Sequence, residues 1–141
     1  MRTRLVLAVL PMAVIGVVAA APGSAAPKNI EKSYTAAASA DPTPNAAGAC
    51  DRGIPGGEHI EPFKVPGAGK LTVDMDAFQG DWDLCIFSKT GSVLGSSAGF
   101  VDVTKESVSI KFKKAAEITI VAQNLIGGPT AAVKYVFVPS K

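Results

Sequence analysis

The stretch Gly80-Asp-Trp-Asp-Leu-Cys-Ile-Phe87 holds the only tryptophan of the 141-residue chain and one of its two cysteines. Successive side chains of a β-strand point to opposite faces of the sheet, so this stretch is predicted to present two different faces. The first face is apolar throughout and carries Trp82, Leu84 and Ile86. The second face carries Asp83, Cys85 and Phe87. We interpret the first face as core.

The second face needs a cover, because a thiol and a phenyl ring stand where a sandwich strand normally places polar groups. The only other cysteine, Cys50, lies just before the globular region. We therefore predict a Cys50–Cys85 disulfide that holds the incoming segment over Phe87. The alternatives are two free thiols and a two-cysteine metal site, the latter without supporting histidines.

The N-terminal residues are typical of a secretory signal peptide. Two arginines precede the apolar run Leu5–Ala21, and small residues follow it. We expect residues 1–25 to form the signal peptide, with cleavage after Ala20 or Ala25. An uncleaved membrane anchor is the alternative, because the apolar run approaches the lower end of the length that spans a bilayer. Pro11 inside the run favours cleavage.

The charge balance argues against a nucleic-acid partner. Lysine and arginine number 14 against 12 acids, but Arg2 and Arg4 belong to the expected signal peptide, so the remaining chain is near neutral. Its basic residues form no stripe interleaved with aromatic residues. A cysteine pair in an exported chain is typical of an oxidising compartment. We expect a secreted, extracellular protein that has no membrane contact after signal cleavage.

Two regions follow the signal peptide. Residues 26–49 are rich in Ala, Pro, Ser and Thr, which predicts a flexible linker because such a segment buries little apolar surface. Residues 50–141 consist of short alternating runs separated by turn formers. They predict one all-β domain, a small antiparallel β-sandwich or jelly roll of six to eight short strands. The prolines of Ile60–Pro66 suit an edge strand, and Ser107–Lys113 alternates most clearly.

Several short patterns in this domain are also found together in a known family. They are Phe-Lys-Val-Pro-Gly-Ala-Gly at 63–69, Leu-Thr-Val at 71–73, the stretch at 80–87, and the later runs Ile-Thr-Ile-Val-Ala and Val-Lys-Tyr-Val-Phe-Val. Residues 63–138 thereby resemble the bacterial pre-peptidase C-terminal domain, with Cys85 where the family pattern has an aromatic residue. The resemblance implies a small β-sandwich of the kind that accompanies secreted peptidases as a noncatalytic appendage, aiding secretion, folding or substrate attachment. We expect a freestanding secreted copy of this module.

Asp74, Asp76, Asp81 and Asp83 fall close together around a predicted turn, and clustered carboxylate oxygens are the ligands that calcium requires. Their spacing is not that of an EF-hand loop. If an ion binds, Asp76, Asp81 and Asp83 are its expected ligands. The favoured interpretation is solvated acids and turn caps. No other cofactor is expected.

His59 is the only histidine and lies between Glu58 and Glu61. A single histidine can act as a general base, but the sequence has neither a Gly-x-Ser-x-Gly nor a His-Glu-x-x-His motif. We therefore expect no enzymatic activity. A small secreted hydrolase is the alternative, and it requires a hydroxyl nucleophile beside His59 in space.

Phe78 and Phe100 lie in predicted loops, where exposed rings would form a small binding platform, although isolated exposed aromatic residues are common. Our leading interpretation is a secreted noncatalytic binding or accessory module of the cell exterior that contacts a protein, the matrix or a polysaccharide. The alternative is a secreted inhibitor or assembly partner of extracellular peptidases. That alternative predicts a rigid exposed loop, within Gly91–Gly99, that enters an active site.

Overall fold

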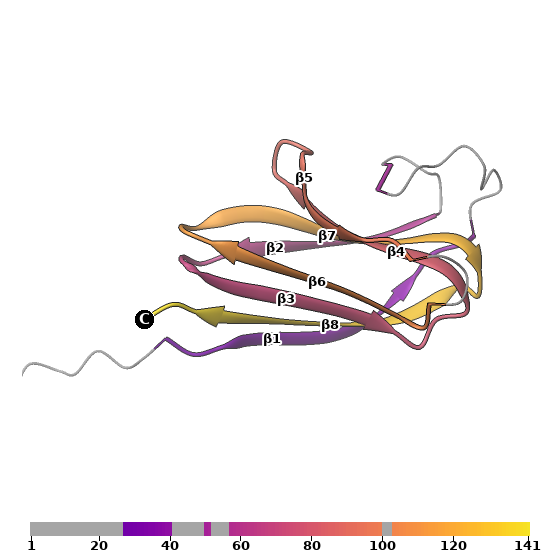
Figure 1. The fold of residues 1–141 in the computed structure, drawn as a ribbon, viewed down its shortest axis with the longest axis horizontal. Helices are drawn as coiled ribbons and strands as arrows, with labels where there is room; N and C mark the ends of the chain where they lie inside the picture. Colours follow the sequence, from indigo (N-terminus) through magenta and orange to yellow (C-terminus); the bar gives the residue numbers. More distant parts are fainter. Residues whose placement is uncertain (1–26, 41–49, 52–56, 100–102) are drawn as a thin grey trace, which may run out of the picture.

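The computed structural model describes residues 27–40, 50–51, 57–99 and 103–141. Within these residues the chain forms eight β-strands and no helix, as Figure 1 shows. The strands are β1 (Ile30–Ala37), β2 (Glu58–Val65), β3 (Gly69–Asp76), β4 (Gly80–Ser88), β5 (Val93–Ser97), β6 (Lys105–Phe112), β7 (Ala116–Gly127) and β8 (Thr130–Pro139). The predicted all-β fold is confirmed.

The strands form two antiparallel sheets that pack as a sandwich. We call the sheet with strand order β1-β8-β3-β6 sheet A, and the sheet with order β2-β7-β4-β5 sheet B. Strand β2 is an edge strand, as its prolines predict, because Pro62 has no backbone N–H to donate to a second neighbour. Strands β3 and β8 occupy the centre of sheet A, where each is paired on both sides.

The main core lies between the sheets and includes the inward face of β4. Trp82, Leu84 and Ile86 are completely buried there, as the alternation predicts. The indole N–H of Trp82 donates a hydrogen bond to the Gly128 carbonyl at 3.2 Å. The only polar atom of the ring is therefore satisfied within the core, which a buried tryptophan requires.

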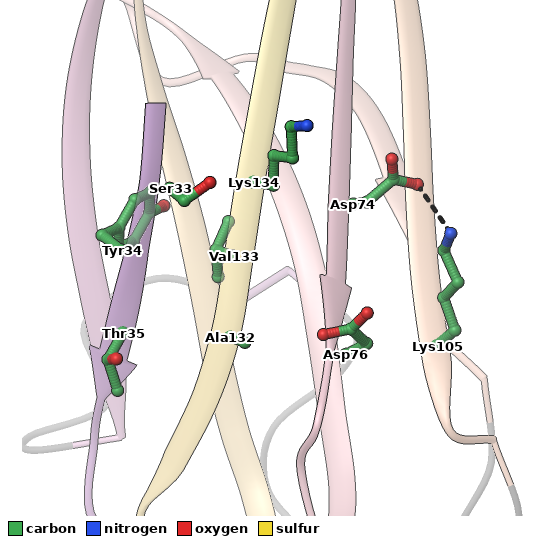
Figure 2. Close-up of a pocket in the computed structure, with 9 residues that line it drawn as sticks. All are labelled: Ser33, Tyr34, Thr35, Asp74, Asp76, Lys105, Ala132, Val133 and Lys134. Atoms are coloured by element: carbon green, nitrogen blue, oxygen red, sulfur yellow. Dashed lines mark ion pairs between the residues drawn. The ribbon is translucent and has the colours of Figure 1, made fainter. Parts of the chain in front are cut away.

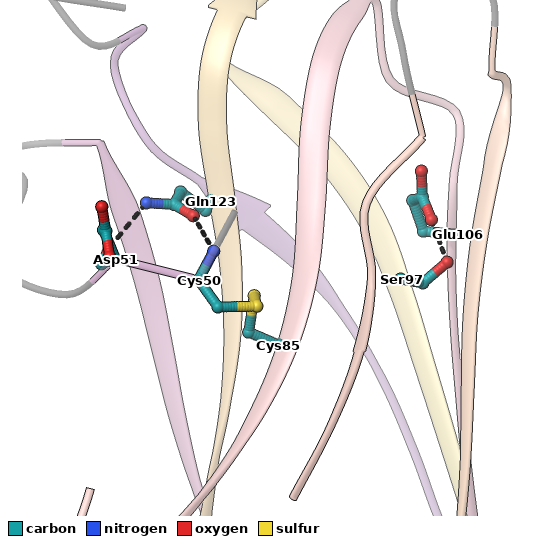
Figure 3. The surroundings of a disulfide bond; sticks show 6 residues. All are labelled: Cys50, Asp51, Cys85, Ser97, Glu106 and Gln123. Atoms are coloured by element: carbon teal, nitrogen blue, oxygen red, sulfur yellow. Dashed lines mark hydrogen bonds between the residues drawn. A yellow bond between two sulfur atoms is a disulfide. The ribbon is translucent and has the colours of Figure 1, made fainter. Parts of the chain in front are cut away.

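The outward face of β4 is covered as predicted, because Cys50 and Cys85 form a disulfide. Cys50 packs against a second, smaller core made of Cys85, Phe87 and Val121. Figure 3 shows that Gln123 on β7 lies beside this bond. Its side-chain oxygen accepts a hydrogen bond from the Cys50 N–H at 3.2 Å, and its amide donates to the Asp51 carbonyl at 2.8 Å. The incoming segment is thus fixed by one covalent bond and two hydrogen bonds.

Strand β1 shows that the prediction of a flexible linker over residues 26–49 was wrong for part of that segment. It lies within 26–49, which the composition predicts to be a flexible linker, yet it pairs with β8 along its whole length. The composition of this segment offers too little apolar surface to offset the entropy lost on ordering. Main-chain hydrogen bonds to β8 and the burial of Ala36 and part of Tyr34 offset that loss instead. The predicted signal peptide and the linker residues 41–49 lie outside the described residues.

Two glycines let the start of β4 lie against the end of β7. Gly80 and Gly127 face each other across these strands, and both have positive φ, +90° and +129°. A Cβ on Gly80 would overlap the Ile126 carbonyl oxygen, so only glycine fits. The register then shifts between Asp81 and Trp82, as at a β-bulge, which changes where the adjacent acids point.

Replacing both cysteines by alanine (Cys50→Ala with Cys85→Ala) is expected to lower the free energy of unfolding by about 3 to 4 kcal/mol, because the disulfide closes a long loop in the unfolded chain. The bond joins residues with a sequence separation of 35. Urea denaturation without reductant measures the change, and the wild-type protein with and without reductant is the control. A loss below about 1 kcal/mol would show that the bond does not anchor the segment.

Tyr34→Ala is expected to lower the free energy of unfolding by about 2 to 3 kcal/mol, because the ring packs against the main core and stacks on His59. Thr35→Ala, at the adjacent exposed position, is the matched control and should change it by less than about 0.5 kcal/mol. Both are measured by urea denaturation. Equally small effects of the two variants would mean that β1 is not docked.

Candidate functional site

The outer face of sheet A is a polar surface to which all four of its strands contribute. On β3 the outward residues Thr72, Asp74 and Asp76 alternate with buried Leu71, Val73 and Met75. Strand register aligns the outward residues of the sheet into rows. One row consists of Thr35, Ala132, Asp76 and Lys105, and the next consists of Ser33, Lys134, Asp74 and Ser107.

An open pocket of about 620 Å³ lies over these two rows. Figure 2 shows Asp74, Asp76, Lys105 and Lys134 around it, contributed by β3, β6 and β8, with the β1 hydroxyls on the opposite side. Ala132 has the shortest side chain in its row. Because longer side chains stand on the neighbouring strands, the surface is lowest near Ala132.

The charged side chains of the pocket are paired weakly. Lys105 Nζ lies 3.4 Å from an Asp74 carboxylate oxygen, which also accepts a hydrogen bond from the Ser107 hydroxyl at 2.8 Å. Lys134 Nζ lies 3.9 Å from Glu31. Such solvent-exposed pairs contribute about 1 kcal/mol or less, so a ligand can replace them at little cost. The pocket therefore offers hydroxyls, carboxylates and ammonium groups for hydrogen bonding.

The structure places the three predicted calcium ligands on different sheets. Asp76 ends β3 on the exposed face of sheet A, whereas Asp81 and Asp83 belong to β4 of sheet B. The chain crosses between the sheets just after Asp76, and this crossing separates residues that are close in sequence. Among the described residues, no group of three or more His, Cys, Asp or Glu side chains is placed to hold a metal ion.

Asp83 is buried although it lies on the outward face of β4, with 2% of its surface exposed. Burial, together with the nearby charges of Asp81 and Glu106, raises the pKa of its carboxyl to about 7. Glu106 is also buried, and it accepts hydrogen bonds from the Ser97 hydroxyl and, at 2.8 Å, from the Gly99 N–H. Figure 3 shows the Ser97 contact. Glu106 was not predicted to lie near Asp81 and Asp83, because it comes from β6 and only the fold brings it near β4.

His59 has a structural position at the β1–β2 edge of the sandwich. Its Nδ1 accepts a hydrogen bond from the Ala37 N–H at 3.3 Å, and its ring stacks on Tyr34 with centroids 5.2 Å apart. Burial raises the pKa of the Tyr34 phenol, whose hydroxyl has no hydrogen-bond partner in the described part of the chain. His59 therefore supports the docking of β1, and the hydrogen bonds described here join it to a backbone amide, not to a hydroxyl nucleophile.

The sequence predicted two features on surface loops, an aromatic platform and a rigid exposed loop. Phe78 is half-buried and packs against the main core, so only part of its ring is exposed. Phe100 lies outside the described residues. The segment Gly91–Gly99 contains β5, whose backbone pairs with β4, so most of it belongs to a strand of sheet B.

Asp83→Asn is expected to stabilise the protein by about 1 to 2 kcal/mol near pH 8. The folded-state pKa of Asp83, about 7, lies above its unfolded value of 3.8, so the contribution of this group to stability is fully present below about pH 4 and is lost as pH rises through 7. The Asn variant should lose most of this decrease, as measured by urea denaturation from about pH 5 to 8. Asp76→Asn, at an exposed position, is the control. If both variants follow the wild-type pH profile, Asp83 is not the titrating group.

Comparisons with known proteins do not assign a family. No family model and no curated protein matches the chain. One similar solved structure is a virus-like particle of Macrobrachium rosenbergii extra small virus, with 14% identity, 94% of this chain and 96% of that chain covered, and a TM-score of 0.27. Another is a Streptococcus pneumoniae fucose binding module, with 15% identity, coverages of 80% and 91%, and a TM-score of 0.30. At these TM-scores neither similarity indicates a shared function.

Proposed function

We propose that this protein is a secreted, noncatalytic binding module of the cell exterior that contacts a polysaccharide through the outer face of sheet A. The observation that supports this proposal is the open pocket of about 620 Å³ over two rows of hydroxyl, carboxylate and ammonium groups. Sugars present many hydroxyl groups, each of which donates and accepts hydrogen bonds. A surface that mixes both kinds of partner suits such a ligand.

The pocket stands on the most constrained part of sheet A. Strands β3 and β8 are each paired on both sides, so Asp74 and Lys134 project from backbone that cannot shift without breaking two ladders. Groups held on rigid strands lose little conformational freedom when a ligand binds. This favours binding by a preformed face.

Two further observations suit a role outside the cell. The Cys50–Cys85 disulfide indicates an oxidising compartment. The resemblance of residues 63–138 to the pre-peptidase C-terminal domain fits the same accessory role.

Ala132→Leu tests this proposal, because the larger side chain fills the lowest part of the pocket from an exposed position without entering the core. We expect about tenfold weaker binding to the polysaccharide that the wild-type protein retains best from a panel of cell-wall and extracellular polysaccharides, measured by affinity electrophoresis. Asp74→Ala should weaken the same binding.

Thr119→Leu, on the outer face of the central strand β7 of sheet B, is the matched control. It should leave the affinity within about twofold of wild type. The proposal fails if the Ala132 and Asp74 variants bind as tightly as this control, or if the wild-type protein retains none of the polysaccharides.

A further inference from the structure

Two lysines face each other on the same outer face of sheet A, beyond the pocket. Lys70 on β3 and Lys111 on β6 are direct partners in the strand register, and both are exposed. On the other side of Lys70, β8 contributes Val138, which is 46% exposed. This row therefore carries two positive charges and no acid among its described residues.

One row separates this pair from the pocket, and it places no acid directly beside the two lysines. It presents the hydroxyls of Thr72 and Ser109, which lie 3.1 Å apart, and its one acid, Glu31, stands two strands away from β3 on β1, 3.9 Å from Lys134 Nζ. The next carboxylate along β3 is Asp74, whose oxygen already contacts Lys105 and Ser107. Neither Lys70 nor Lys111 has an ion pair in the part of the chain that the structure describes.

Like charges directly opposite each other destabilise an antiparallel strand pair. An anionic group seated between the two ammonium groups would turn this repulsion into attraction, with hydroxyl donors of the adjacent row within reach. Lys70 and Asp76 are six residues apart on β3, so the pair and the far row of the pocket are separated by about 20 Å. A polymer can contact both.

We propose that the polysaccharide bound by sheet A is acidic, with a carboxylate, sulfate or phosphate group held between Lys70 and Lys111. This inference rests on the proposed function, because it assigns the charge of the ligand of the same face. The net formal charge of the whole chain is only +2, and Arg2 and Arg4 account for it. The net charge of the protein therefore attracts an acidic polymer only weakly, and retention of such a polymer would depend on a local group of cationic side chains.

The test compares dextran sulfate, polygalacturonate and neutral dextran of similar length as probes, by isothermal titration calorimetry at about 50 and 300 mM NaCl. We expect tighter binding of the two acidic polymers than of dextran, and weaker binding at the higher salt concentration. The double variant Lys70→Gln with Lys111→Gln should weaken binding of the acidic polymers about tenfold or more.

The matched control is Lys64→Gln with Lys89→Gln, which removes the same charge from sheet B and the β4–β5 turn. It should remain within about twofold of wild type. Equal losses in the two double variants, equal binding of dextran and dextran sulfate, or no binding of either acidic polymer would overturn the inference. So would equally tight, Lys70-dependent binding of double-stranded DNA or anionic phospholipid vesicles.

The same measurement on Ala132→Leu separates the inference from the function on which it rests. If Ala132→Leu binds dextran sulfate as wild type does while the Lys70 and Lys111 variant does not, the lysine pair holds anions but the pocket is not part of the site, and the proposed function fails. If Ala132→Leu loses binding of dextran sulfate while the lysine variant does not, the pocket holds the polymer without the lysine pair and this inference fails.

Discussion

Strand β4 is buried on both faces, and the rest of the fold is arranged so that each face is covered by other residues. Its inward side chains require sheet A, because Trp82 would otherwise expose the largest apolar surface in the chain. Its outward side chains have no sheet to cover them, so Cys50 is tied across Phe87 by a covalent bond. A domain of this size has a limited number of large apolar side chains, and this arrangement buries those on both faces of one strand.

Alternation in the sequence was sufficient to predict this strand and the side that forms the core, because both depend on residues of one short stretch. The disulfide could be predicted because the outward face needs a cover and Cys50 is the only other cysteine in the chain. Strand β1 could not be predicted in the same way. Its Ala, Ser and Thr residues have no pattern of large apolar side chains, and its order depends on hydrogen bonds to β8, which lies at the other end of the sequence. Tertiary pairing decided the structure of this segment.

Asp74 and Asp76 were singled out from the sequence, but the rest of the candidate site was missed for a related reason. Ser33, Lys134, Asp74 and Ser107 come from four separate parts of the chain, and only the register of three strand pairs brings them into one row. The alternation of β8 places Lys134 outward, but it does not reveal the neighbours of that lysine. Asp81 was predicted from its closeness in sequence to other acids and Phe78 from its place in a predicted loop, but the crossing between sheets puts Asp81 on sheet B and Phe78 packs against the main core.

The chain enters β1 and leaves β8 at the same end of the sandwich, since Ile30 pairs with Phe137, and Figure 1 shows the C-terminus beside the start of β1. The row that contains Thr35 and Lys105 lies toward the opposite end of sheet A. A protein attached to a bead, a surface or a larger partner just before β1 or just after β8 would therefore hold its pocket toward the end of sheet A that is farther from the attachment point. Immobilisation through the N-terminal or the C-terminal side would give the same orientation.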